Sequence, residues 1–164
     1  MVKEGPEIAR FMVKKTEFSR MILVWDHHGS GWEKFKPDEA VTRIERRLDG
    51  VTWTDRSAGV VIVPELEEWL WHCPSSLARH FGSKAADFEA TTTGALSQMN
   101  LTRERCCREK PKELFEAVLY QLERRKPLPE DFEMLGSSCN LTKWIGSETF
   151  ARFVEKLRAW FPRP

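Results

Sequence analysis

Residues 21–31, MILVWDHHGSG, join a run of large apolar side chains to a sharp polar turn. The run carries no charge before Asp26, and strands that helices cover on both faces have this continuous apolar character. Gly29 and Gly31 then favour a reversal of the chain. The stretch predicts a buried strand over residues 20–25 that ends in a turn bearing one carboxylate and two imidazoles.

The segments around this stretch predict a βαβ unit. Pro37 suits the first turn of a helix and Gly50 suits its end. Residues 59–63, GVVIV, form a second continuous apolar run. Two such strands joined by a helix of about a dozen residues belong to a parallel sheet, so the predicted fold class is α/β. A short amphipathic helix is expected before the first strand, over residues 6–15.

The rest of the chain has a mainly helical pattern. Helices are expected over residues 64–71, 76–81 and 111–125, and a last one follows the N-cap residue Ser147. Residues 83–102 are polar and weakly patterned, which predicts a mobile insertion.

The length of the chain favours one compact domain. We expect a single domain over residues 1–164, with an α/β part over residues 1–72 and a mainly helical C-terminal part over residues 73–164.

Composition limits the classes of function. The chain has 26 Lys and Arg residues against 25 Asp and Glu residues, so nucleic-acid binding would need a local basic patch. No segment approaches the ~18 uninterrupted apolar residues of a membrane span, and the N-terminus has no apolar signal region, so a cytoplasmic protein is predicted. The cysteines are expected to be free thiols: Cys73, Cys106, Cys107 and Cys139.

Polar residues follow both predicted strands. Asp26, His27 and His28 come after the first strand, and Glu65, Glu67 and Glu68 come after the second. Ligands bind beyond the carboxyl ends of parallel strands, so these groups can converge there. Carboxylate oxygens suit Mg²⁺, an imidazole can hold a water or accept a proton, and the glycines would let the backbone approach a phosphate.

Each of these groups also has a structural explanation. Asp26 can accept backbone hydrogen bonds at a turn, and acidic residues at a helix N-terminus complement its dipole by about 0.3–1 kcal/mol each. Glu67 differs because it lies one position from the apolar stripe of its helix, where it can reach back toward the strand ends.

Four blocks of sequence carry a resemblance to a known family. In order they are LVWDHHGSGWE (residues 23–33), VVIVPELEEWLW (60–71), KPKELFEAVL (110–119) and SETFARFVEKLRAWFP (147–162). Over residues 19–162 the chain resembles a Toprim-like family of bacterial proteins. The nearest type is the fourth component of methylation-associated phage-defence systems, and RloB-like proteins are more distantly similar.

The resemblance implies a metal site. Toprim domains hold Mg²⁺ with a glutamate after a first strand and an Asp-X-Asp pair after a later one, to cut or join phosphodiester bonds. By position, Asp26 matches the first aspartate and Glu67 matches the glutamate of the Glu-X-Trp block. His28 falls where the family has a second acidic residue. Imidazole suits Mn²⁺ better than Mg²⁺, so the expected cofactor is Mg or Mn.

The start of the chain also departs from the family pattern. Only 25 residues precede Asp26, and the three residues before the Glu4-Gly5 pair are too few for the buried strand that leads into the family's Glu-Gly motif. The general acid or base of the family is therefore either missing or supplied by a partner chain.

Residue type and spacing suggest two further candidate sites, one for nucleic acid and one for zinc. Lys110 and Lys112, with the neighbouring Arg105 and Arg108, either belong to a solvated helix face or grip nucleic-acid phosphates. A zinc site is a weaker alternative, because no Cys-X-X-Cys or His-X-X-X-His spacing is present. Its candidate ligands are His72, Cys73, His80, Cys106, Cys107 and Cys139.

Two functions follow from these expectations. The first is an anti-phage defence component with a metal-dependent nuclease site formed by Asp26, His28 and Glu67, while Lys112 contacts nucleic acid. The second is a catalytically degenerate Toprim-like subunit that binds or regulates other proteins of a defence complex. Seven tryptophans add a third expectation, an exposed apolar patch and a homo-oligomer.

Overall fold

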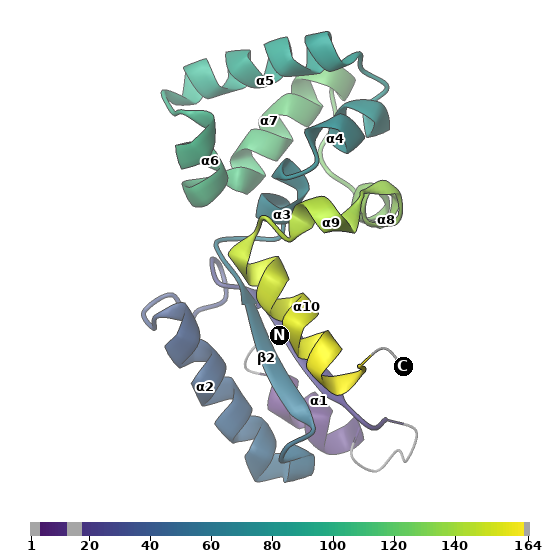
Figure 1. The fold of residues 1–164 in the computed structure, drawn as a ribbon. Coiled ribbons are helices and arrows are strands. Elements are labelled where there is room, and N and C mark those ends of the chain that lie inside the picture. Colours follow the sequence, from purple (N-terminus) through teal and green to yellow (C-terminus); the bar gives the residue numbers. More distant parts are fainter. Residues whose placement is uncertain (1–3, 13–17, 163–164) are drawn as a thin grey trace. The chain divides into compact units, whose positions relative to one another are not determined.

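The computed structural model describes residues 4–12 and 18–162, and the chain divides into two compact units. Unit 1 comprises Met1–Val63 and Arg152–Pro164, and unit 2 comprises Pro64–Ala151. In the described residues, unit 1 contains the sheet and unit 2 is helical (Figure 1). The protein is thus a mixed α/β protein, as predicted.

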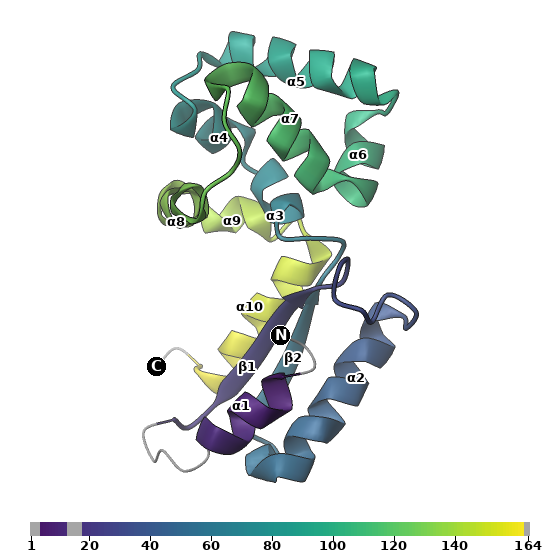
Figure 2. The ribbon, with the colours of Figure 1, turned by 180° about the vertical axis from the view of Figure 1, so that it is seen from behind.

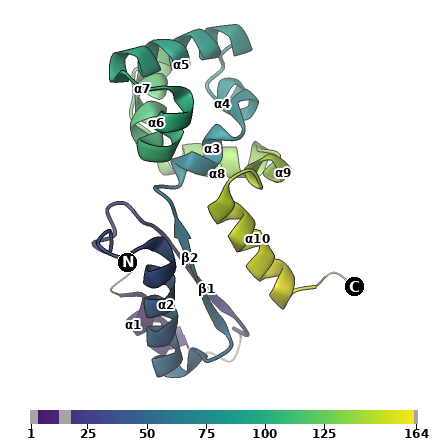
Figure 3. The same cartoon turned by 60° about the vertical axis from the view of Figure 1, so that its left-hand side comes forward.

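The sheet of unit 1 consists of two parallel strands. β1 (Met21–Asp26) lies beside β2 (Ser57–Ile62) (Figure 3). The pairing places Met21 opposite Ser57 and Asp26 opposite Ile62. This pairing confirms the parallel sheet that the two apolar runs predict.

Helices of unit 1 connect and cover the strands. The crossover helix α2 (Pro37–Leu48) begins at the predicted proline, and α1 (Gly5–Met12) precedes the sheet. Helix α2 ends at Leu48, and the segment that follows, η1 (Asp49–Trp53), leaves helical geometry just after Gly50, at Val51 and Thr52. Thr52 then reverses the chain with a φ of 74°.

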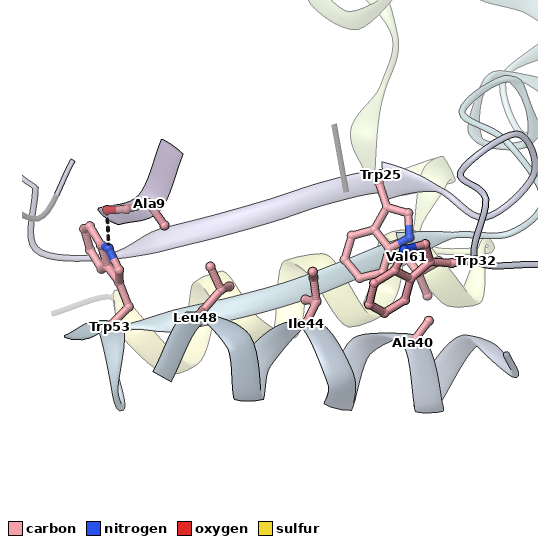
Figure 4. Close-up of a cluster of buried hydrophobic side chains, with 8 residues drawn as sticks. All are labelled: Ala9, Trp25, Trp32, Ala40, Ile44, Leu48, Trp53 and Val61. Atoms are coloured by element: carbon pink, nitrogen blue, oxygen red, sulfur yellow. Dashed lines mark hydrogen bonds between the residues drawn. The ribbon is translucent and has the colours of Figure 1, made fainter. Parts of the chain in front are cut away.

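One face of the sheet packs against α1 and α2 through a tryptophan-rich core (Figure 4). The indole Nε1 of Trp53 donates a hydrogen bond to the carbonyl oxygen of Ala9 at 2.8 Å, which ties α1 to the end of η1. Gly59 permits the close approach of α2, because a Cβ atom there would lie 2.9 Å from Cγ2 of Ile44. The core consists of Ala9, Trp25, Trp32, Ala40, Ile44, Leu48, Trp53 and Val61.

The opposite face of the sheet is also covered. Ala58, Val60 and Ile62 are buried, and Figures 1 and 2 show α10 (Glu148–Trp160) on the side of the sheet away from α1. The guanidinium of Arg20 stacks over the Trp160 ring, 5.4 Å from its centroid. Coverage of both faces explains why the strands lack alternating polar residues.

Unit 2 is built from short helices around aromatic side chains. Helix α5 packs along α7, and the Phe81 ring lies 6.2 Å from that of Phe88 and 5.6 Å from that of Phe115. The helices are α3 (Glu67–Trp71), α4 (Pro74–His80), α5 (Ala85–Met99), α6 (Arg103–Glu109), α7 (Pro111–Glu123), α8 (Pro129–Ser138), α9 (Leu141–Trp144) and the start of α10.

The prediction of a mobile insertion over residues 83–102 is wrong, because α5 occupies most of that segment. Its inner stripe mixes Phe88 and Leu96 with Thr92 and Ala95, so its apolar periodicity is weak. The Thr92 hydroxyl is buried, but it donates to the Phe88 carbonyl oxygen at 2.8 Å and is thereby satisfied within the helix.

Other sequence-based predictions are confirmed. Ser147, the predicted N-cap residue, caps α10 by accepting a hydrogen bond from the Phe150 amide. All four cysteines are free thiols. In the part of the chain that the structure describes, each helix is too short or too polar to span a bilayer.

Candidate functional site

The turn after β1 begins where the strand pairing ends. The amide of His27 still donates to the carbonyl oxygen of Ile62, at 2.8 Å, and so extends the pairing by one residue. Gly29 and Gly31 then adopt φ angles of 72° and 75°, in the left-handed region that favours glycine. The two glycines are therefore needed to reverse the chain at the carboxyl end of the strand.

The polar groups of this turn bond mainly to one another. The Ser30 hydroxyl donates to the carbonyl oxygen of His27 at 2.7 Å and accepts from the amide of Trp32 at 3.1 Å. The Nε2 atom of His27 donates to the carbonyl oxygen of Phe35 at 3.0 Å. The imidazole of His27 thus fastens the turn to the segment that leads into α2.

Glu33 supplies an anion to the backbone amides of the same turn. The amide of Gly31 donates to Oε1 of Glu33 at 3.2 Å. Hydrogen bonds from its own amide, and then from the Gly31 and Gly29 amides, hold the pKa of the Glu33 carboxyl below its usual value. These are the glycine amides that the sequence predicts to approach a phosphate, and in the structure the Glu33 carboxylate takes that position.

The predicted metal ligands lie in different parts of the chain. Asp26 is the last residue of β1 and is half-buried, whereas His28 is exposed on the turn two residues later, so both belong to unit 1. Glu67 is the first residue of α3 in unit 2, where it is 7% exposed. Among the residues that the structure describes, no three His, Cys, Asp or Glu side chains group to hold a metal ion. Convergence of Asp26, His28 and Glu67 on a cation stays a prediction.

Glu68, beside Glu67, has a clear structural role within unit 2. Its carboxylate accepts from Nε2 of His72 at 2.8 Å and from the hydroxyl of Ser147 at 2.6 Å. These bonds join α3 to the start of α10. The four-residue spacing of Glu68 and His72 on one helix face is a signal that sequence reasoning missed.

An ion pair between the buried Asp131 and the partly exposed Arg125 in unit 2 was also not predicted. Arg125 donates to both carboxylate oxygens of Asp131 at 2.6 Å, and Nε2 of His80 donates to the same carboxylate at 2.8 Å. The guanidinium hydrogen bonds hold the pKa of Asp131 well below its usual range. Asp131 also accepts from the amide of Leu128 at 2.8 Å, so it caps α8 as well as fixing α4. Only the Leu128–Asp131 spacing could have been read from the sequence.

The cysteines offer little for zinc chemistry. Burial raises the pKa of the Cys107 thiol to about 11, and burial likewise raises the pKa of Cys106 and Cys139. Zinc binds thiolates, and these environments favour the protonated thiol.

The predicted nucleic-acid contacts lie on the surface of unit 2. Lys110 and Lys112 are exposed at the start of α7, next to α6, in which two of the three arginines pair with acidic residues. Arg103 pairs with Glu89 at 2.6 Å, and Arg105 pairs with Glu109 at 3.0 Å. Lys110, Lys112 and the neighbouring Arg108 are thus exposed cations of this segment.

No known protein family matches the chain, and neither the curated proteins nor the solved structures include a significant match to it.

Proposed function

We propose that the protein is a cytoplasmic component of a bacterial anti-phage defence system, in which it acts as a binding subunit of a multi-protein complex. The observation that carries the binding role is the turn after β1, where the Glu33 carboxylate accepts a hydrogen bond from the Gly31 amide. The defence role rests on the resemblance of the four sequence blocks to Toprim-like defence proteins.

The hydrogen bonds of the turn argue against a phosphate there. A phosphate at these amides would have to displace the Glu33 carboxylate and would meet its negative charge. The His27 ring holds the Phe35 carbonyl and so is engaged in closing the turn. These internal hydrogen bonds favour a structural role for the turn, which is consistent with a subunit that binds other proteins.

A metal-dependent nuclease is the second candidate function. Asp26 ends β1 at the carboxyl edge of the parallel sheet, and His28 is exposed two residues beyond it. In this proposal Asp26, His28 and Glu67 hold Mg²⁺ or Mn²⁺, which would stabilise charge on the cleaved phosphate. Lys110 and Lys112 contact the nucleic-acid backbone.

Phage plating distinguishes the two functions. The wild-type protein, Asp26→Ala and His28→Ala are produced in cells that carry the rest of the defence system, with protein levels checked by immunoblotting. A binding subunit predicts full protection by both variants, because neither turn residue performs chemistry. Protection that is lost in both variants at wild-type protein levels would favour the nuclease.

A further inference from the structure

In the residues that the structure describes, the outer edge of β1 has no strand beside it. The amides of Met21 and His27 donate to Arg56 and Ile62, so the odd-numbered residues of β1 direct their backbone groups to β2. The backbone groups of Ile22 and Val24 therefore point to the opposite edge. Among the described residues, the sheet contains only β1 and β2, and no strand pairs with this edge.

Apolar side chains flank this edge. A groove of about 350 Å³ runs between α1 and β1, lined by residues that include Ile8, Met12, Phe18 and Ile22. Ile8 is 53% exposed, Phe18 is 43% exposed, and Phe11, one helical turn after Ile8, is 66% exposed. Exposed edges are usually protected by charges or proline, and none occurs between Met21 and Trp25.

The charges at the two ends of β1 are self-complementary. Arg20 and Asp26 each lie three residues from Leu23. An antiparallel pairing of two β1 strands centred on Leu23 places Ile22 opposite Val24 of the second copy, where both present outward backbone groups. The same register places each Arg20 opposite Asp26 of the second copy, so the two ends attract rather than repel.

We propose that the protein forms a two-fold symmetric dimer through this edge. Two β1 strands pair antiparallel with Leu23 on the two-fold axis, which joins the two sheets into one four-stranded sheet. The axis is perpendicular to the sheet, so the two α1 helices lie on the same face and bury Ile8 and Phe11 against each other. This interface goes beyond the proposed function and holds under either candidate role.

Light scattering and sedimentation of the full chain test the dimer. Wild type is expected to show twice the 19.1 kDa mass of one chain, with dissociation on dilution. Val24→Pro removes an outward amide of β1 and is expected to give a monomer with an unchanged circular-dichroism spectrum. Ser57→Pro, at an outward amide on the far edge of β2, is the matched control and is expected to stay dimeric.

Charge exchange tests the register even if the proline variant does not fold. Because the dimer is symmetric, Arg20→Asp and Asp26→Arg each create two pairs of like charges, one at each end of the paired strands. Each variant is expected to raise the dimer dissociation constant by at least about tenfold. The double variant, which restores opposite charges, is expected to recover the dimer. A wild-type monomer at every concentration, or a dimer that neither Val24→Pro nor the charge changes weaken, would overturn the proposal.

Discussion

At the scale of single residues, the Glu33 carboxylate is the acceptor that the turn after β1 supplies for its own backbone amides. The carboxylate accepts a hydrogen bond from the Gly31 amide. Ser30 donates to the His27 carbonyl oxygen, and the His27 ring donates to the Phe35 carbonyl oxygen. The sequence alone suggested a phosphate-binding turn, because the two glycines could be identified from it. The hydrogen bond from the Gly31 amide to Glu33 could not be predicted. That hydrogen bond depends on the reversal of the chain at the two glycines.

Replacing this carboxylate is expected to change the acid stability of the fold. The pKa of Glu33 is lower in the folded state than its ordinary value of 4.5, so its contribution to stability is present above that pH and is lost as the pH falls through the folded pKa. Glu33→Gln is expected to be less stable than wild type at pH 7 and to lose less stability on acidification.

Urea unfolding at neutral and acid pH measures this effect. Glu155→Gln, an exposed change on α10, serves as the control for loss of one carboxylate. Identical unfolding midpoints for wild type and Glu33→Gln at both pH values would show that the turn does not use this carboxylate.

At the scale of secondary-structure elements, the strength of the local pattern decided what could be predicted. The strands and α2 were predicted because continuous apolar runs and a first-turn proline mark them directly. Helix α5 was not, because threonine and alanine make up much of its buried stripe. The contact of His80 with Asp131 joins residues 51 positions apart, and no local pattern reports such a pair.

Two glycines provide a matched test of the packing of β2 and of the existence of α5. Gly59→Ala is expected to destabilise the protein by about 1–3 kcal/mol, because the added Cβ lies 2.9 Å from Ile44 and 3.3 Å from Trp25. Gly94→Ala has open space inside a helix and is expected to stabilise by about 0.5–1 kcal/mol. Thermal unfolding of both variants gives the comparison, and destabilisation by Gly94→Ala would speak against α5.

The ion pair that joins α4 to α8 gives a second prediction at this scale. Asp131→Asn leaves His80 without its carboxylate partner and leaves Arg125 paired with Glu123 alone, in a site where the Asp131 side chain is 5% exposed. We expect the free energy of unfolding to fall by about 2–3 kcal/mol. The loss is smaller than for a fully buried pair because Arg125 is partly solvated. Urea unfolding measures it against Asp87→Asn, an exposed change on α5. Equal midpoints for the two variants would contradict the structural role of the pair.

At the scale of the whole molecule, the protein combines a covered parallel sheet with a helical unit that has its own aromatic core. The α/β class and the parallel pairing were predictable, because both strands carry the pattern of a sheet buried on two faces. The Toprim-like assignment and the metal site remain proposals that rest on sequence resemblance. What the structure adds is a set of hydrogen-bond partners for the turn where catalysis was expected.

Calorimetric titration of the pure protein with Mn²⁺ and Mg²⁺, alongside a nucleic-acid cleavage assay, tests the binding-subunit role most directly. Wild type is compared with Asp26→Ala. We predict the same heats for both proteins and no metal-dependent cleavage by either. Stoichiometric metal binding and cleavage by wild type, both abolished in a folded Asp26→Ala variant, would contradict the binding-subunit proposal and establish the nuclease.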